Sequence, residues 1–122
     1  MANDKNDGQL NGILKKIRQT PRLNPEEEKR LFRAIAFDSV AKRKLIDAYL
    51  YLVLEIAEEF YKSGQDLQKR TLNELFQEGL EGLFRALEKY SPKKDYHFAD
   101  YARWWIRQTL IESSIKGGDS DA

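Results

Sequence analysis

Apolar residues recur along most of the chain at gaps of three and four, the spacing that places side chains on one face of an α-helix. No stretch alternates convincingly between apolar and polar positions, as a half-buried strand would. The clearest stripe is formed by Leu45, Tyr49, Leu52, Val53, Ile56 and Phe60. The pattern therefore predicts an all-α fold, a compact bundle of about four to five helices with no sheet.

Capping signals divide this pattern into separate helices. Two starts carry the capping-box spacing, in which a capping side chain stands three residues before a glutamate: Asn24 with Glu27, and Thr71 with Glu74. Glycine or proline marks the ends of the three later helices, because both residues favour helix termination. The expected helices span residues 24–36, 38–63 and 71–90, followed by a last helix that begins between 96 and 100 and ends before 117.

The two ends of the chain differ from its middle in composition. Both ends are rich in Asn, Asp, Gly and Ser and offer little apolar surface to bury. We expect a disordered N-terminal tail over residues 1–9, one helical domain over 10–115 and a disordered C-terminal tail over 116–122. A length of 122 residues leaves room for one domain with one modest core.

Composition excludes several kinds of site. The chain has no cysteine and one histidine, so it offers no disulfide and no thiolate or multi-histidine metal site. We expect no metal and no cofactor. The longest uncharged apolar run, Ala48–Leu54, is far shorter than the roughly 20 residues of a membrane span, and residues 1–8 lack an apolar signal segment. The sequence predicts a soluble, cytoplasmic protein with no membrane partner.

Charge is balanced overall but distributed unevenly. The formal net charge of +1 argues against a protein that coats nucleic acid through charge alone. Residues 55–81 carry three positive and seven negative side chains, whereas residues 85–107 carry six positive and three negative ones. This asymmetry indicates two surfaces for two kinds of partner, although ordinary solvated helix faces would give the same pattern.

Segment 90–107 combines large aromatic side chains with cations, as single-stranded nucleic-acid binding requires. Bases stack on aromatic rings for roughly 1–3 kcal/mol each, while lysines and arginines contact phosphates. At 100° per residue, one side of a helix carries Tyr101, Trp104, Trp105 and Gln108, and another, which can face the core, carries Ala102, Ile106, Thr109 and Leu110. The alternative is that the rings are core packing, their usual role, but two adjacent tryptophans are hard to bury together in a small domain.

Four blocks of the sequence resemble, in order, the primary-type sigma factors of bacterial RNA polymerase, in their region-two domain and the end of region one. The blocks are LNPEEE at 23–28, AYLYLVLEIA at 48–57, ELFQEGLEGLFRALEKY at 74–90 and FADYARWWIRQ at 98–108. They lie within a match over about residues 13–111. The resemblance implies a domain that docks on core RNA polymerase and binds and melts the minus-ten promoter element by capturing the non-template single strand.

The resemblance also implies roles for individual residues. The face that docks on the coiled coil of the polymerase's largest subunit is matched by Glu74, Gln77 and Glu78. The expected polymerase-binding set also includes Phe84 and Leu80, although Leu80 replaces an asparagine of the family. The aromatic residues that hold the melted promoter strand are matched by Tyr96, Phe98, Tyr101, Trp104 and Trp105, and the glutamine that reads the upstream base pair by Gln108. Phosphate contacts, and with them salt-dependent binding, are expected from Arg85, Lys89, Lys93, Lys94 and Arg107.

The sequence departs from the family at positions that bear on DNA binding. Asp100 replaces a threonine beside the flipped base, where a carboxylate repels phosphates, and Ile111 and Glu112 replace residues that are usually polar and basic. These departures favour an alternative function, a stand-alone or split-sigma regulatory protein that binds core RNA polymerase but has lost sequence-specific promoter melting. An anti-sigma factor or a second sigma polypeptide would then be a further partner.

A catalytic role is the least favoured class, and we expect that the protein is not an enzyme. Glu74 and Glu78 lie one helical turn apart and could in principle serve acid–base chemistry. The sequence has no second histidine, no glycine-rich phosphate loop and no metal-ligand spacing to accompany them. The pair is better explained as a docking surface or a solvated helix face.

Overall fold

The computed structural model describes residues 4–116, with side chains from residue 8 onward. Five helices make up the described chain: α1 (Asp4–Gln19), α2 (Pro25–Ala34), α3 (Ser39–Ser63), α4 (Leu72–Lys89) and α5 (Phe98–Lys116). The all-α prediction is confirmed, since residues 4–116 contain no strand. Within residues 4–116, every helix is too short or too polar to span a bilayer.

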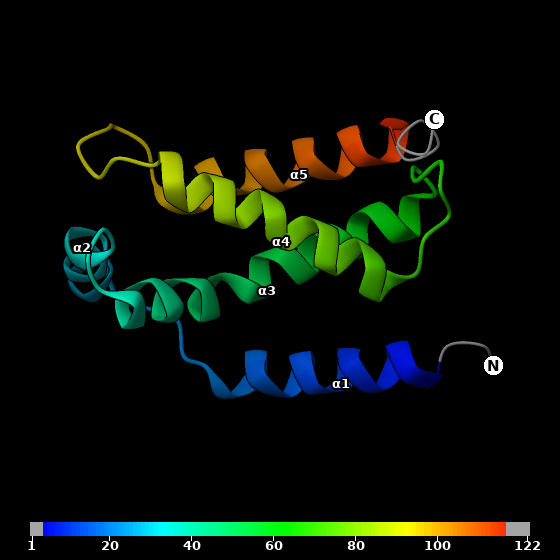
Figure 1. Ribbon diagram of the computed structural model, residues 1–122, viewed down its shortest axis with the longest axis horizontal. Helices are drawn as coiled ribbons and strands as arrows, with labels where there is room; N and C mark the ends of the chain where they lie inside the picture. The colour runs from blue at the N-terminus through cyan, green and yellow to red at the C-terminus, as the bar shows by residue number, and fades with distance from the viewer. Residues whose placement is uncertain (1–3, 117–122) are drawn as a thin grey trace.

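Three helices, α3, α4 and α5, pack against one another and form the centre of the molecule (Figure 1). Helices α3 and α5 run in the same direction, and α4 runs antiparallel to both. Helix α2 packs across the N-terminal end of α3, while α1 lies along α3 on the side away from α5 and also contacts α4. The two sides of α3 are therefore covered by different partners.

Helix α3 supplies much of the core, as its apolar stripe predicts. The predicted residues are all buried: Leu45, Tyr49, Leu52, Val53, Ile56 and Phe60. Burial of a side chain of this kind stabilises the fold by roughly 1.5–3 kcal/mol. The helix starts where the Asp38 side chain accepts the N–H of Val40 at 2.9 Å, and it ends at Gly64, whose positive φ of 71° suits a residue without a Cβ.

Both predicted capping boxes are present. The Asn24 side chain accepts the N–H of Glu27 at 2.8 Å at the start of α2, and the Thr71 hydroxyl accepts the N–H of Glu74 at 3.1 Å at the start of α4. Each glutamate accepts the N–H of its capping residue in return. The helix starts are therefore fixed by local hydrogen bonds that the sequence alone identifies.

Helices α4 and α5 approach each other closely at Gly82. A Cβ on this residue would lie 2.7 Å from the Cα of Ile106 and 2.8 Å from the carbonyl oxygen of Trp105. Those atoms belong to the backbone of α5 and cannot rotate away as a flexible side chain can. The missing side chain of Gly82 therefore sets the distance between the two helices.

The connection between α3 and α4 is tied to the C-terminal part of α5. Leu67 donates its N–H to the Ser114 hydroxyl at 2.7 Å. Within the connection, buried Asp66 accepts the Arg70 side chain at 2.9 and 3.0 Å, and backbone N–H groups from Arg70 and Gln68. Burial alone would raise the pKa of Asp66, but these hydrogen bonds lower it to about 2.

The structure differs from the expected N-terminal tail, because α1 begins at Asp4. Gln9, inside that tail, accepts a hydrogen bond from the Asn73 side chain at 2.8 Å, and Lys16 pairs with Asp47 at 3.3 Å. The residues of α1 that pack against the core are Leu10, Ile13, Leu14 and Ile17. At the other end α5 includes Lys116, the first residue of the expected C-terminal tail; residues 1–3 and 117–122 lie outside the described chain, where the tails stay predictions.

Candidate functional site

Phe98 belongs to the core, which corrects the prediction that it contacts a DNA strand. Its exposed fraction is 0%. Its ring packs against three others, with centroid distances of 5.1 Å to Phe32, 4.9 Å to Tyr49 and 5.1 Å to Tyr90. These rings come from α2, α3 and the C-terminal end of α4. The alternative role of aromatic core packing therefore holds for Phe98.

The other four predicted rings follow one another from the loop before α5 onto the surface of that helix, and we call them the ring row: Tyr96, Tyr101, Trp105 and Trp104. Successive centroids lie 5.1, 6.3 and 5.3 Å apart. Trp104 is 55% exposed and Tyr96 is 36% exposed, while Tyr101 and Trp105 are half-buried against the core. The first and last rings of the row are therefore exposed, and the two rings between them pack against the core.

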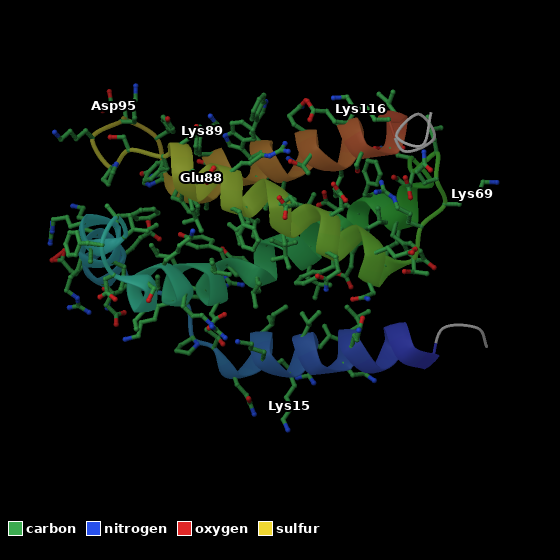
Figure 2. All side chains as sticks on the ribbon, viewed as in Figure 1. Lys15, Lys69, Glu88, Lys89, Asp95 and Lys116 are labelled. Carbon is green, nitrogen blue, oxygen red and sulfur yellow. The ribbon has the colours of Figure 1, made fainter. Side chains whose placement is uncertain are left out.

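Trp105 is partly buried and partly at the surface. Its indole nitrogen is buried and has no hydrogen-bond partner within the described chain. Lys89, which is labelled in Figure 2, lies in the last turn of α4. Its ammonium group is 5.8 Å from the centroid of the indole, which is within the range of a cation–π contact. Trp105 therefore anchors the ring row to α4, and Trp104 is the tryptophan that faces solvent.

Tyr90 holds the loop between α4 and α5 in place, a role that sequence reasoning did not assign. Its hydroxyl donates to the carbonyl oxygen of Tyr96 at 3.0 Å, and the two rings lie 5.8 Å apart. Burial raises the pKa of Tyr90, which further favours the protonated hydroxyl that donates this hydrogen bond. The same loop, in which Figure 2 labels Asp95, also carries Lys93 and Lys94, and both are exposed.

A cavity of about 520 Å³ lies between α2 and this loop. Its volume falls within the range of small-molecule sites in proteins. Its lining includes rings and charged groups, among them Phe32, Tyr90, Tyr96, Glu28 and Lys94. The Glu28 carboxylate accepts the hydroxyl of Tyr49, and burial, together with this carboxylate, raises the pKa of Tyr49. Tyr96 therefore belongs both to the ring row and to the wall of a cavity.

Two arginines of α5 are paired with glutamates of α3. Arg103 lies 3.1 Å from Glu55, and Arg107 lies 3.2 Å from Glu59. Arg107 was expected to contact phosphate, whereas the glutamates and Arg103 were not predicted as site residues. No local sequence signal identifies these pairs, because the partners stand 48 residues apart and meet only when α3 and α5 pack in register.

The remaining predicted DNA contacts lie along the α4 side of α5. Arg85 is exposed, and its guanidinium group lies 4.0 Å from the carboxylate of Glu112. Glu112 is one of the departures from the family, and its negative charge partly neutralises the positive charge that Arg85 was expected to offer to a phosphate. Lys89 is also exposed, and Gln108 is half-buried. The structure thus brings most of the predicted set to one region while pairing two of its arginines, Arg85 and Arg107, with carboxylates.

The predicted polymerase-binding residues lie on α4. Glu74 and Gln77 are exposed, whereas Glu78, Leu80 and Phe84 are half-buried. One carboxylate oxygen of Glu74 accepts a hydrogen bond from the N–H of the capping residue. The carboxylate of Glu74 therefore stabilises the start of α4, in addition to any contact that it makes with a partner.

Phe84 lines a groove of about 390 Å³ between α3 and α4. Ile46 lies in the same groove, and the remaining lining is charged: Lys42, Glu81, Arg85 and Glu88. An apolar floor with a charged rim is the usual composition of a protein-binding surface. Among the residues that the structure describes, no cluster of three or more His, Asp or Glu side chains could hold a metal ion.

Three comparisons with known proteins bear on this geometry. The chain is 40% identical over 108 residues to RNA polymerase sigma factor SigA of Clostridium acetobutylicum, covering 88% of this chain and 27% of that protein. It is 44% identical over 83 residues to SigA2 of Synechococcus elongatus, covering 68% and 24%, and 36% identical over 98 residues to RpoS of Coxiella burnetii, covering 80% and 26%. The chain spans about a quarter of the length of these relatives.

Residues 45–114 match the family described as sigma-70 region 2. The matched stretch contains most of α3, all of α4 and nearly all of α5. The ring row, the paired arginines and the α4 groove therefore draw most of their residues from it. This match confirms the resemblance to region two, whose three sequence blocks at 48–57, 74–90 and 98–108 all lie within it, and the chain belongs to the sigma-70 region 2 family.

Proposed function

We propose that this chain is a transcription-initiation domain that docks on core RNA polymerase and binds and melts the minus-ten promoter element through capture of the non-template single strand. The observation that carries the proposal is the exposure of Trp104 at the end of the ring row. A tryptophan that contributes so little to the core has its π-face available for stacking. Exposed rings beside lysines are the surface that unpaired bases bind.

The ring row and the neighbouring cavity together suit strand capture. Removing a base from its stack costs a few kcal/mol, and stacking on a ring returns roughly 1–3 kcal/mol per base. Tyr96 connects the two features, because its ring lies in the row and lines the cavity. Several stacked bases and one inserted base would offset the cost of opening the duplex without ATP.

Polymerase docking is proposed for the outer face of α4. The relatives are named RNA polymerase sigma factors, and the family resemblance implies the coiled coil of the largest subunit as the partner. The α4 face offers carboxylates from Glu74 and Glu78 together with the apolar floor around Phe84. A basic helical hairpin with apolar side chains would complement both features.

Two binding experiments on the purified chain test the two halves separately. A pull-down measures retention of core RNA polymerase, and a gel shift measures binding of single-stranded oligonucleotides with a TATAAT or a scrambled sequence. We expect retention of the polymerase and tighter binding of TATAAT. Equal binding of the two oligonucleotides would contradict sequence-specific capture, and no retention would contradict docking.

The second candidate is a regulator that binds core RNA polymerase but no longer melts promoters. The observation that favours it is the number of carboxylates near the expected phosphate contacts: Glu55, Glu59 and Glu112 pair with arginines, and Asp100 is exposed in the first turn of α5. In that role a second sigma polypeptide or an anti-sigma factor would be a further partner. This candidate predicts polymerase retention with no gel shift at moderate salt.

A further inference from the structure

The two ion pairs between α3 and α5 form a regular arrangement, which we call the ladder. Glu55 and Glu59 are one helical turn apart on α3, and Arg103 and Arg107 are one turn apart on α5. The two helices run in the same direction (Figure 1), so both pairs can form at once with the same offset of 48 residues. The glutamates are 52% and 56% exposed at their side chains, so the ladder lies at the surface.

The ladder borders the ring row. On a helix with 100° per residue, Arg103 and Arg107 lie on one side of Trp104, whereas Tyr101 and Trp105 lie on the other side. The paired arginines face α3, and the half-buried rings face α4. A strand stacked on Trp104 would therefore bring its phosphates near two guanidinium groups that already have carboxylate partners.

We propose that Glu55 and Glu59 occupy Arg103 and Arg107 in place of nucleic-acid phosphates, and so restrict strand binding to sequences whose bases the ring row captures. This inference rests on the proposed function. Phosphate contacts position a strand but carry no sequence information. Weakening them lowers the affinity for every sequence, so that the base contacts decide which strand remains bound.

The strength of exposed ion pairs suits this role. Such pairs are worth about 0–1 kcal/mol, so a phosphate can displace the glutamate from an arginine. The displaced carboxylate stays attached to α3 and repels the phosphate at short range. A strand that gains enough free energy from stacking therefore displaces the glutamates from the arginines. A strand that gains less is repelled by them and does not stay bound.

A competing explanation is that the ladder only fastens α3 to α5. Replacing the glutamates by glutamine would then lower the melting temperature and leave nucleic-acid binding unchanged. Our inference predicts the reverse: a small change in melting temperature and a clear change in binding. The two explanations therefore differ in their measurable outcome.

The test compares the wild-type chain with the double variant Glu55→Gln/Glu59→Gln. A matched control, Glu26→Gln/Glu58→Gln, removes the same charge at two glutamates that are not part of the ladder. Dissociation constants are measured by fluorescence anisotropy for TATAAT and scrambled single strands over a range of salt concentrations, and melting temperatures are measured in parallel.

The double variant is expected to bind the scrambled strand roughly tenfold more tightly at low salt, with a smaller gain for TATAAT. The slope of log affinity against log salt should steepen by about 0.7 for each arginine that becomes free to contact a phosphate. Adding Arg103→Gln and Arg107→Gln to the double variant should remove this extra slope. The control variant should show a smaller gain and no change in slope beyond that of the wild type.

Different failures have different meanings. If the wild type binds TATAAT selectively but the double variant has the same affinities and slope, this inference is overturned and the proposed function stands. If neither the wild type nor the double variant binds any strand, the proposed function and this inference both fail. If the wild type binds neither strand and the double variant binds both, the masking of the arginines is supported.

Discussion

Phe98 and Trp104 are large aromatic residues six positions apart on α5, yet their surroundings give them opposite roles. Phe98 begins a buried stripe whose members are all 0% exposed: Phe98, Ala102, Ile106 and Leu110. Trp104 points away from that stripe and is 55% exposed. Their position around the helix axis, rather than their chemistry, decides which ring supports the fold and which is free to stack on a base.

Replacing these two rings should therefore have different consequences. Trp104→Ala should leave the melting temperature nearly unchanged and weaken single-strand binding by about 1–3 kcal/mol, because one stacking surface is lost. Phe98→Ala should cost about 3–5 kcal/mol of stability, because it leaves a cavity in the core. Thermal melts and anisotropy titrations of both variants measure these effects. Unfolding of Trp104→Ala would show that this indole is needed by the core.

Asp66 makes the stability of the fold depend on pH. Its pKa is about 2 in the folded chain and about 3.9 in an unfolded one, so folding favours the charged form. Asp66 therefore contributes stability above about pH 4, of roughly 2 kcal/mol, and this contribution is lost as the pH falls from 4 to 2. Urea denaturation at several pH values should show the loss in the wild type. The Asp66→Asn variant should lack that part of the slope, and an equal slope would contradict the assignment.

The sequence predicts individual residues well where one helix decides their burial. The stripe of α5 that can face the core is recognisable from spacing, and its predicted members Ala102, Ile106, Thr109 and Leu110 are buried. Phe98 was misassigned because its burial depends on rings from α2, α3 and α4, which helical spacing does not reveal. The same limit hides the glutamates of the ladder.

At the scale of helices, the contact between α4 and α5 decides where the ring row lies. Gly82 brings the backbone of α4 against the backbone of α5, and Lys89 then lies over Trp105 one to two turns further along. A wider separation would shift α5 as a unit relative to α4 and to the ladder's two glutamates on α3. Packing at one glycine therefore affects the whole surface that we propose for strand binding.

The two glycines of α4 should respond differently to substitution by alanine. At Gly82 a Cβ would lie 2.7 Å from a backbone atom, and Gly82→Ala should cost about 3 kcal/mol, the upper end for overpacking. At Gly79 the nearest atom is a side-chain carbon of Val53 at 3.0 Å, which can move, so Gly79→Ala should cost less. Denaturant unfolding compares the two, and equal costs would contradict the close approach of α4 and α5.

A substitution at Glu78 tests the docking face that we propose for α4. Glu78→Lys should weaken binding of core RNA polymerase by at least tenfold, because like charges at an interface cost several kcal/mol. Single-strand affinity should stay the same, since the ring row lies on another helix. Polymerase pull-down and anisotropy measure the two properties, and a melting curve checks that this half-buried position tolerates lysine. Unchanged retention of the polymerase would contradict the docking assignment.

Helix boundaries are predictable where a local signal fixes them. The boxes at Asn24 and Thr71 and the stop at Gly64 are in place, because each depends on hydrogen bonds or backbone geometry within a few residues. The start of α1 is not predictable in this way. Its first turns are polar, and the contact of Gln9 with Asn73 joins parts of the chain that are 64 residues apart.

For the whole molecule, the bundle carries two separate surfaces around one core. Helix α4 takes part in both: its outer face carries the proposed docking residues and the groove with α3, and its C-terminal turn contacts the ring row through Lys89. The family and the helical class were predictable because both depend on ordered sequence blocks and on periodicity. The balance of charge between arginines and glutamates became visible only when α3 and α5 were placed side by side.

Trp104 can report directly on whether bases stack on the ring row. The chain has two tryptophans, so Trp105→Phe leaves Trp104 as the single indole and keeps an aromatic ring in the half-buried position. Its fluorescence is measured while single-stranded TATAAT is added, with anisotropy recorded to confirm binding. The account predicts that Trp104 emission is quenched in proportion to the bound fraction. Saturated binding with unchanged emission would contradict it.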